Sequence, residues 1–253
     1  MDKDFDILVK NGWLTEEEAE KFANDKDMQI AIENCTSPQK ENIFRALKEV
    51  PLNLVKVFIL GKDPYPNPKD AHGLAFSSDN TKTPESLKNI FKAIDKAYGS
   101  DLFQKAHNNL TNWVNQGVLL LNTGLTFQKV DGDISLQNKV QRQHMKVWKP
   151  FVKLVINKIL SVKDRPVVMM LWGNDAHDIV FKNIKDKEFQ KYNHDRGLGV
   201  NVIIPGTKIL LLQCSHPSPL TVNRGGDFPE TAPIHFKKCD EFLGKDKIKW
   251  TEL

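Results

Sequence analysis

Four short runs of consecutive apolar residues stand out along the chain. They are Val55–Leu60, Val118–Leu121, Val167–Trp172 and Lys208–Leu212. None of them alternates between polar and apolar positions, and continuous apolar runs of this length are typical of strands buried on both faces. The pattern therefore predicts four strands inside a sheet that is covered on both sides.

Between these runs, apolar residues recur at helical spacing. The clearest case is Leu87–Tyr98, for which Thr83 is the expected N-cap, Pro84 the first helical residue and Gly99 the residue just past the end. The other helical patterns are Leu110–Val114, Trp148–Ile159, Ala176–Val180 after a cap at Asn174, Phe236–Leu243, and a capping box formed by Thr15 and Glu18. Strands alternating with helices predict an α/β fold with a central four-stranded parallel sheet and helices on both faces.

Composition adds little that would change this picture. The 253 residues are 40% hydrophobic and 27% charged, as in an ordinary globular protein, and no repeat or linker divides them, so we expect one domain over residues 1–253. The start of the chain has no signal-peptide pattern and no apolar run approaches a membrane span, so we expect an intracellular protein without a membrane partner.

Cysteine content and charge exclude some classes of site without identifying one. The three cysteines are dispersed, which is typical of reduced thiols and gives no paired spacing for a metal, so we expect neither a metal nor a cofactor. A net charge of +4 is compatible with a polyanionic partner, although from charge alone a solvated surface is the preferred explanation.

Polar and aromatic residues gather just after the predicted strands, where ligands bind in open parallel sheets. They are Asp63, Tyr65, His72 and Phe76 after the first strand, Asn122 after the second, Gly173 and Asn174 after the third, and His216 after the fourth. Each has a structural alternative: the aspartate as a turn former, the asparagine as a cap, the histidine as a loop residue and the aromatics as core. Their shared position nevertheless predicts one site at one edge of the sheet.

Five segments resemble a known family. GKDPYPNPKDAHGLAFS resembles the water-activating segment, GQDPYH followed by AHGLAFS, of the uracil-DNA glycosylases that exclude thymine. VLLLNTGLT, VVMMLWGNDA, SHPSPLTVNRG and IKWTEL are similar to that family's later motifs and occur in the family order. The resemblance extends from about Val55 to the C-terminus, whereas residues 1–41 match loosely.

The resemblance implies hydrolysis of the N-glycosidic bond of deoxyuridine in DNA, which releases uracil and leaves an abasic site. In this family's scheme Asp63 orients the water and stabilises the cationic sugar. His216, as a neutral imidazole, donates a hydrogen bond to uracil O2. A carboxylate suits the oxocarbenium-like transition state of glycosidic cleavage, and a donor suits the developing charge on the base.

The resemblance also assigns the residues that bind uracil. Lys62 contributes backbone contacts, Phe76 stacks on the ring, and Tyr65 stands against C5 and excludes a methyl group. Asn122 bonds the amide edge of uracil, because a side-chain amide presents a donor and an acceptor side by side.

DNA contacts and partners follow from the same resemblance. A base in a duplex must be flipped out and the gap filled by an apolar wedge, the role implied for Leu220. The other implied DNA contacts are Ser86, Gly173, Asn174, Pro217, Ser218 and Arg224. The implied partners are uracil-containing DNA and a DNA-mimic inhibitor protein, the implied state is a monomer, and the implied location is the cytoplasm, or a nuclear or viral-host compartment if the source is not bacterial.

The chain departs from the family pattern at several positions. Lys62 stands in place of Gln, Pro66 in place of His and Asn174 in place of Ser, and the segment after Arg224 is longer. Pro66 removes an imidazole expected near the water. It therefore motivates an alternative function, a DNA-binding replication accessory protein of the same fold with weakened catalysis. A flavodoxin-like nucleotide-binding enzyme has no phosphate-loop motif to support it, and three cysteines cannot hold a four-cysteine iron–sulfur cluster.

Overall fold

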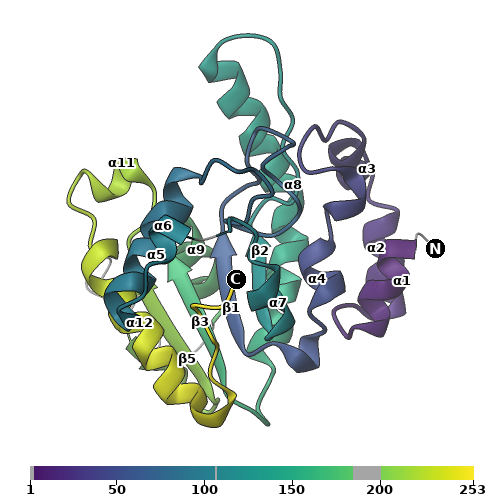
Figure 1. The fold of residues 1–253 in the computed structure, drawn as a ribbon. Helices are drawn as coiled ribbons and strands as arrows, with labels where there is room; N and C mark the ends of the chain where they lie inside the picture. Colours follow the sequence, from purple (N-terminus) through teal and green to yellow (C-terminus); the bar gives the residue numbers. More distant parts are fainter. Residues whose placement is uncertain (1–2, 106, 185–200) are drawn as a thin grey trace.

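The computed structural model describes residues 3–105, 107–184 and 201–253, and a single twisted sheet lies at the centre of them (Figure 1). Its strands are β1 (Val57–Gly61), β2 (Val118–Asn122), β3 (Val167–Trp172), β4 (Asn201–Ile203) and β5 (Ile209–Cys214). In the order β2-β1-β3-β5-β4, the first four strands are parallel and β4 runs antiparallel to β5. The α/β fold and the four predicted strands are confirmed.

The sequence pattern missed the fifth strand. β4 has three residues and lies at the edge of the sheet, where Ile203 is 53% exposed. A short strand with one exposed face does not produce a continuous apolar run, so the predicted count of four was one too few.

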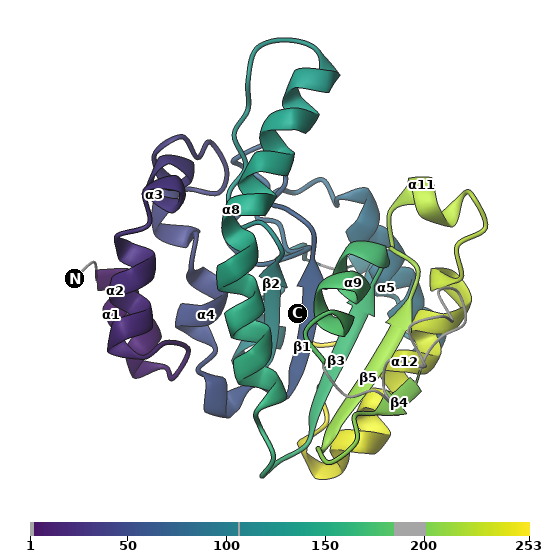
Figure 2. The same ribbon diagram turned by 180° about the vertical axis from the view of Figure 1, so that it is seen from behind.

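Helices cover both faces of the sheet (Figures 1 and 2). On one face lie α5 (Glu85–Tyr98) and α12 (Phe228–Leu243), and on the other lie α8 (Ile134–Leu160) and α9 (Asn174–Phe181). The remaining described helices are α1 (Lys3–Lys10), α2 (Glu16–Ala23), α3 (Lys26–Glu33), α4 (Arg45–Glu49), α6 (Leu102–Lys105), α7 (Thr111–Asn115) and α11 (Pro219–Val222), with 3-10 turns at Lys40–Asn42, Leu52–Leu54 and Gly244–Asp246. None of the helices in these ranges is long and apolar enough to cross a membrane.

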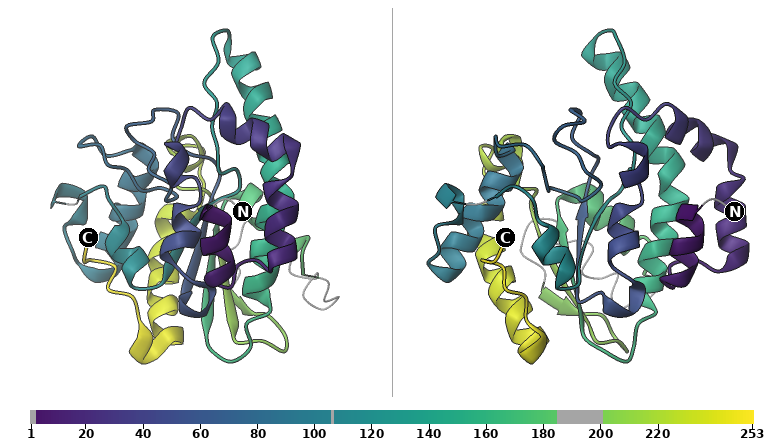
Figure 3. Two further views of the ribbon diagram at one scale, coloured as in Figure 1. Left: turned by 90° about the vertical axis from the view of Figure 1, so that its right-hand side faces the viewer. Right: turned by 45° about the vertical axis from the view of Figure 1, so that its right-hand side comes forward.

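The loosely matched N-terminal region packs on the same core as the rest. Figure 3 shows α1–α3 beside α8. Phe22 of α2 meets Phe151 of α8 edge to face, with ring centroids 5.2 Å apart, and Lys158 pairs with Glu18 at 3.0 Å. One continuous hydrophobic cluster extends from Phe5 to Trp250.

The helix ends are capped largely as predicted, but two of the N-caps lie one residue away from the predicted position. The capping box is present, since Thr15 Oγ1 accepts from the Glu18 N–H at 3.2 Å and Glu18 Oε2 from the Thr15 N–H at 2.8 Å. Gly99 ends α5 in the left-handed region, at φ +67°. The predicted caps Thr83 and Asn174 were each wrong by one position, because Pro84 (ψ 145°) and Gly173 (φ +93°) hold the non-helical cap conformations.

The helix α8 is much longer than its apolar pattern. The pattern covers residues 148–159, whereas the helix begins at Ile134, where Asp133 caps it by accepting from the Leu136 N–H at 2.9 Å. Its first turns extend past the carboxyl edge of the sheet (Figure 1), and Ile134 is 75% exposed there. A helix that has no core to pack against shows no apolar periodicity.

Candidate active site

The parallel register brings the strand ends to one level, and the site lies there. Gly61 at the end of β1 is paired with Asn122 at the end of β2, and Trp172 at the end of β3 is paired with Cys214 at the end of β5. Residues 62–84, which follow β1, contain no helix or strand. They run across this edge of the sheet.

Hydrogen bonds fix the first half of this loop. The Ser37 hydroxyl donates to the carbonyl oxygen of Tyr65 at 2.6 Å, and the Tyr65 hydroxyl donates to the carbonyl oxygen of Phe76 at 2.8 Å. Phe76 has a φ of +65°, a conformation that costs energy in a residue with a side chain. The loop therefore holds both aromatic residues rigidly and stores backbone strain at Phe76.

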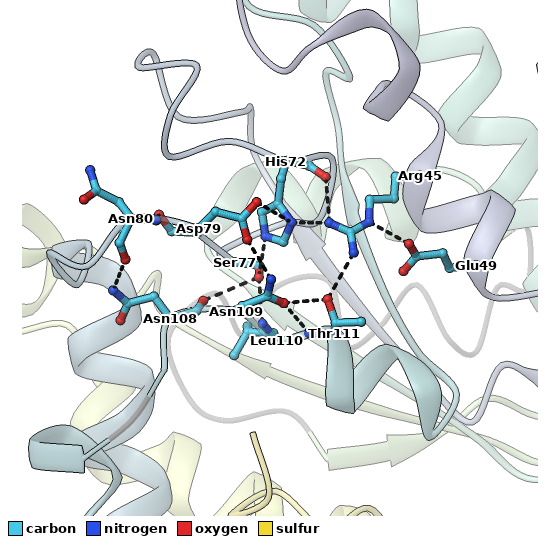
Figure 4. A network of polar contacts seen from close by, with 11 residues as sticks. Arg45, Glu49, His72, Ser77, Asp79, Asn80, Asn108, Asn109, Leu110 and Thr111 are labelled. Atoms are coloured by element: carbon cyan, nitrogen blue, oxygen red, sulfur yellow. Dashed lines mark hydrogen bonds and ion pairs between the residues drawn. The ribbon is translucent and has the colours of Figure 1, made fainter.

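A buried network centred on His72 fixes the second half (Figure 4). The Arg45 guanidinium contacts Nδ1 of His72 and donates to the His72 carbonyl at 3.2 Å, while Nε2 of His72 lies 2.7 Å from the Ser77 hydroxyl. Because a guanidinium can only donate, Nδ1 accepts and Nε2 carries the proton. Burial lowers the pKa of His72 to about 4. This histidine, one of the residues expected at the site, anchors the loop and does not line the cavity.

A small cavity opens at the carboxyl edge of the sheet. Its volume is about 160 Å³. Pockets for drug-sized ligands typically measure about 300–1,000 Å³, so this cavity is of a size that suits a single ring. It is lined by Lys62, Asp63, Pro64, Tyr65, Pro66, Ala71, Gly73, Leu74, Phe76, Ser86, Asn122 and His216. All six residues predicted for catalysis or uracil binding thus meet in one place, together with Ser86.

Asp63 is a half-buried carboxylate with three polar neighbours. Burial raises its pKa, the Lys62 ammonium lowers it, and the Asp175 carboxylate raises it. The Gln141 side-chain amide, a nearby hydrogen-bond donor whose Nε2 also lies 3.4 Å from the Thr126 carbonyl, lowers the pKa as well. Gln141 comes from α8 and is 7% exposed, and the sequence reading missed it. The signal that could have found it is a polar residue seven positions before the core residue Trp148, on the buried face of the helix.

His216 is held as a neutral imidazole. Its Nδ1 accepts the Ser218 N–H at 3.0 Å, so the proton of the neutral ring lies on Nε2, which remains a donor for a ligand. Burial, and then the Lys62 ammonium, lowers its pKa to about 4. Gly173 packs against His216. At φ +93° any residue with a side chain would have a strained backbone, and a Cβ there would lie 2.9 Å from the Cβ of His216.

The remaining walls are an amide and an aromatic ring. A Cβ on Gly61 would overlap Oδ1 of Asn122, so the absence of a side chain at Gly61 makes room for the amide. The Phe76 ring meets Trp172 edge to face, with centroids 5.4 Å apart, and lies 5.9 Å from the His216 ring. The cavity therefore combines an amide, a ring face, a carboxylate and a neutral imidazole.

A second, more polar hollow adjoins the first. Its volume is about 470 Å³, and Lys62 and His216 line both hollows. Of the predicted DNA contacts it contains Gly173, Asn174 and Ser218. Asp175 also lines it and pairs with Lys62 at 3.7 Å between Nζ and Oδ2.

The other predicted DNA contacts lie on or beside α11. The Pro217 carbonyl accepts from the Asn89 amide at 2.8 Å, which ties this loop to α5. Leu220 is 63% exposed and Arg224 is exposed, and neither lines either hollow. Both therefore stand outside the cavity, on the surface next to it.

The extra residues after Arg224 form the beginning of α12. Asp227 accepts the Ser215 N–H at 2.7 Å, and the Ser215 hydroxyl accepts the Phe228 N–H at 2.8 Å. The longer segment is thus tied to the end of β5, next to the loop that carries His216. Within the described ranges, no group of three or more His, Cys, Asp or Glu residues could hold a metal ion.

Comparison with known proteins agrees with the sequence motifs. The family model of the uracil DNA glycosylase superfamily matches residues 47–243. A uracil-DNA glycosylase of Streptococcus uberis is 35% identical over 222 residues, which cover 87% of this chain and 85% of that protein. One of Idiomarina loihiensis is 37% identical over 226 residues, which cover 88% of each chain.

Solved structures share the fold at lower identity. The crystal structure of mimivirus uracil-DNA glycosylase has a TM-score of 0.65 at 20% identity, covering 98% of this chain and 85% of that one. That of UNG from Nitratifractor salsuginis has a TM-score of 0.53 at 21% identity, covering 96% and 92%. By the family model and by relatives above 30% identity over most of its length, this chain belongs to the uracil DNA glycosylase superfamily.

Proposed function

We propose that this chain hydrolyses the N-glycosidic bond of deoxyuridine in DNA, by flipping the nucleotide into the cavity beside Asp63 and His216. The observation that carries the proposal is one small cavity that holds a carboxylate, a neutral imidazole with a donor at Nε2, an amide and an aromatic ring. The products are uracil and an abasic site.

The two catalytic residues act on opposite charges. As the bond breaks, positive charge develops on the sugar and negative charge on uracil. The Asp63 carboxylate stabilises the sugar and accepts a hydrogen bond from the attacking water. His216 donates from Nε2 to uracil O2, and its low pKa keeps it neutral, so it stabilises the leaving base as a hydrogen-bond donor without carrying a charge.

The remaining cavity residues determine which base is accepted. Asn122 binds the amide edge of uracil, Phe76 stacks on the ring, and the Lys62 backbone contacts the base. Tyr65 stands against C5, and its hydrogen bonds to Ser37 and Phe76 at both ends give a wall that cannot retreat from a methyl group. A rigid wall is needed, because an attractive pocket discriminates one methyl group only about 10- to 200-fold.

DNA contacts surround the cavity mouth. Leu220, which is exposed on α11, enters the duplex as the base leaves. Phosphates are held by Ser86, Gly173, Asn174, Pro217, Ser218 and Arg224. The protein acts as a monomer on DNA in the cytoplasm, or in the nuclear or viral-host compartment of a non-bacterial source. A mimivirus UNG variant has been solved in complex with UGI, and an inhibitor that mimics DNA is the protein partner proposed here.

Pro66 favours a second candidate function, that of a DNA-binding accessory protein with weakened catalysis. Pro66 lines the cavity where the family has a histidine. An observation against this candidate is that Gln141 of α8 places a side-chain amide near Asp63. We expect this amide to help position the water.

Uracil release under multiple turnover separates the two functions. The substrates are matched oligonucleotides with uracil, thymine or cytosine at one position. We expect many turnovers on uracil and none on the other two, and near-complete loss of turnover with retained DNA affinity in Asp63→Asn. DNA binding without repeated turnover on uracil would favour the accessory protein.

A further inference from the structure

The helix α8 carries an unusual charge pattern. Its 27 residues include six basic side chains and no aspartate or glutamate. Five of the six recur at spacings of three and four residues, at Lys139, Arg142, Lys146, Lys149 and Lys153. At 100° per residue they fall within an arc of about 80° on one side of the helix. The result is a continuous basic stripe.

Most of this stripe lines a groove between α8 and α9, which lie side by side in Figure 2. The groove has a volume of about 430 Å³ and contains Arg142, Lys146, Lys149 and Lys153. The first three of these are exposed and Lys153 is half-buried. Met145 and Ile179 supply apolar surface between the cations.

These four cations differ from other basic residues of the chain in their ion pairing. Lys158 on the same helix pairs with Glu18 at 3.0 Å, and Lys48 pairs with Asp4 at 2.8 Å. Even Lys182, across the groove, pairs with Asp178 at 3.1 Å. Over the described ranges, the four groove cations of α8 form no ion pair. Like charges at these spacings repel one another and destabilise a helix, and an anionic ligand would relieve that repulsion.

The groove begins at the active site. Thr123, which lines the groove, directly follows Asn122, and Asp175 lines both the groove and the polar hollow beside the cavity. From there α8 runs along the strands and away from the carboxyl edge (Figure 2). A duplex lying across that edge would meet only the upper end of the groove, whereas a single strand can turn and follow it.

We propose that the groove between α8 and α9 binds the phosphate backbone of a single DNA strand that continues from the flipped nucleotide. Arg142 and Lys153 are 11 residues apart, or about 16 Å along the helix, which matches about five stacked nucleotides at 3.4 Å each. Among the residues that the structure describes, no aromatic one lines the groove, so binding there is electrostatic and independent of sequence. This inference rests on the proposed function in taking DNA as the ligand.

The test removes the four charges together, as Arg142→Gln, Lys146→Gln, Lys149→Gln and Lys153→Gln. Its probe is a fluorescein-labelled strand of about 25 thymidines without uracil, with Kd measured by anisotropy over a range of salt concentrations. We expect at least about tenfold weaker binding at moderate salt. The slope of log K against log salt should shrink by up to about 2.8, at 0.7 for each lost contact on a single strand.

A control of equal charge lies away from the groove: Lys10→Gln, Lys21→Gln, Lys245→Gln and Lys247→Gln, all at exposed positions. Both quadruple variants are checked for the parent's melting temperature. Equal losses of affinity in the two variants would overturn the proposal, because net charge alone would then explain them. A loss on a duplex as large as that on the single strand would overturn the assignment to single-stranded DNA.

Uracil release separates this proposal from the proposed function. On a uracil oligonucleotide of about four nucleotides, too short to reach along the groove, the groove variant should keep the parent's kcat/KM, and on the long strand it should lose at least about tenfold. Equal losses on both lengths would contradict the groove. Absence of uracil release by the parent would refute the proposed function alone, since the anisotropy measurement does not depend on cleavage.

Discussion

Replacing Gly61 by alanine tests whether the Asn122 amide binds the base. Gly61 ends β1 and is paired in register with Asn122. Its φ lies outside the left-handed region, so alanine strains the backbone little at this position. The added methyl group would overlap Oδ1 of Asn122 and would lie 2.9 Å from Cβ of Ala75. The perturbation therefore acts mainly on the amide, which the methyl group would approach more closely than it approaches Ala75.

The expected size follows from the displacement. To restore an ordinary contact of about 3.5 Å, the Asn122 amide must move by about 1 Å. A misplacement of about 1 Å costs roughly 100-fold in rate when the displaced group positions the substrate. Overpacking at a buried site also costs about 1–3 kcal/mol of stability, which a domain with several kcal/mol in reserve survives.

The assay is kcat/KM for uracil release, together with the Kd of free uracil and the melting temperature. Gly124→Ala is the matched control, because it also adds one methyl group at a glycine without positive φ. There the nearest atom is Cγ of the flexible Met145, at 3.2 Å. The control should lose less than about threefold in kcat/KM, since a methionine side chain adapts readily.

A double-mutant cycle makes the result decisive. If the methyl group acts through the amide, Gly61→Ala should add almost nothing once Asn122 is already alanine. Full activity in Gly61→Ala, or a further 100-fold loss in the double variant, would refute the assignment of Asn122 to the amide edge of uracil.

Three further predictions concern selectivity and pH. Tyr65→Ala should release thymine slowly and uracil less efficiently than the parent, and no thymine release above that of a Tyr65→Ala, Asp63→Asn double variant would count against the wall. Lys62→Gln should shift the acid limb of the pH profile of kcat/KM to higher pH, because Lys62 lowers the pKa of the Asp63 carboxyl, which must be ionised. An acid limb at the same pH in the variant and in the parent would contradict this. The free energy of unfolding should be highest above about pH 6.5 and should fall between pH 6.5 and 4. The loss at pH 5 should reach roughly 2 kcal/mol for each buried histidine, because the unfolded chain binds protons that the folded chain excludes. The histidines concerned, with pKa values of about 4, are His72, His216 and His235. Equal urea midpoints at pH 7 and pH 5 would disprove it.

Burial decides which parts of this fold can be predicted from the sequence. The four parallel strands are buried except at Asn122, the last residue of β2, so their apolar runs are continuous and their ends were predicted within two residues. The edge strand β4 and the first turns of α8 have no core on one or more sides, and no periodicity marks them. Runs and periods of apolar residues arise where an element contacts the core, so an element with few core contacts cannot be predicted from them.

The site was predictable where chemistry follows a strand directly. Asp63, Asn122 and His216 come within two residues of their strand ends, and the parallel register alone brings such positions together. Gln141 comes near Asp63 from a helix 78 positions along the chain, and no local sequence feature predicts that the two are neighbours. His72 shows the opposite case. It lies in the right loop, but its partners Arg45 and Ser77 hold it away from the cavity.

The departure at Lys62 has a physical consequence that its position in the motif does not reveal. The proposed reaction needs Asp63 charged and His216 neutral in the same small cavity. Burial favours the neutral form of both, which suits the imidazole and opposes the carboxylate. A nearby cation attracts a carboxylate and repels an imidazolium, so the Lys62 ammonium lowers both pKa values, and both changes are in the direction that the reaction needs. Asp175 opposes both effects and lies 3.7 Å from the same ammonium. The charge state of the site is therefore controlled from its rim, where DNA phosphates would approach.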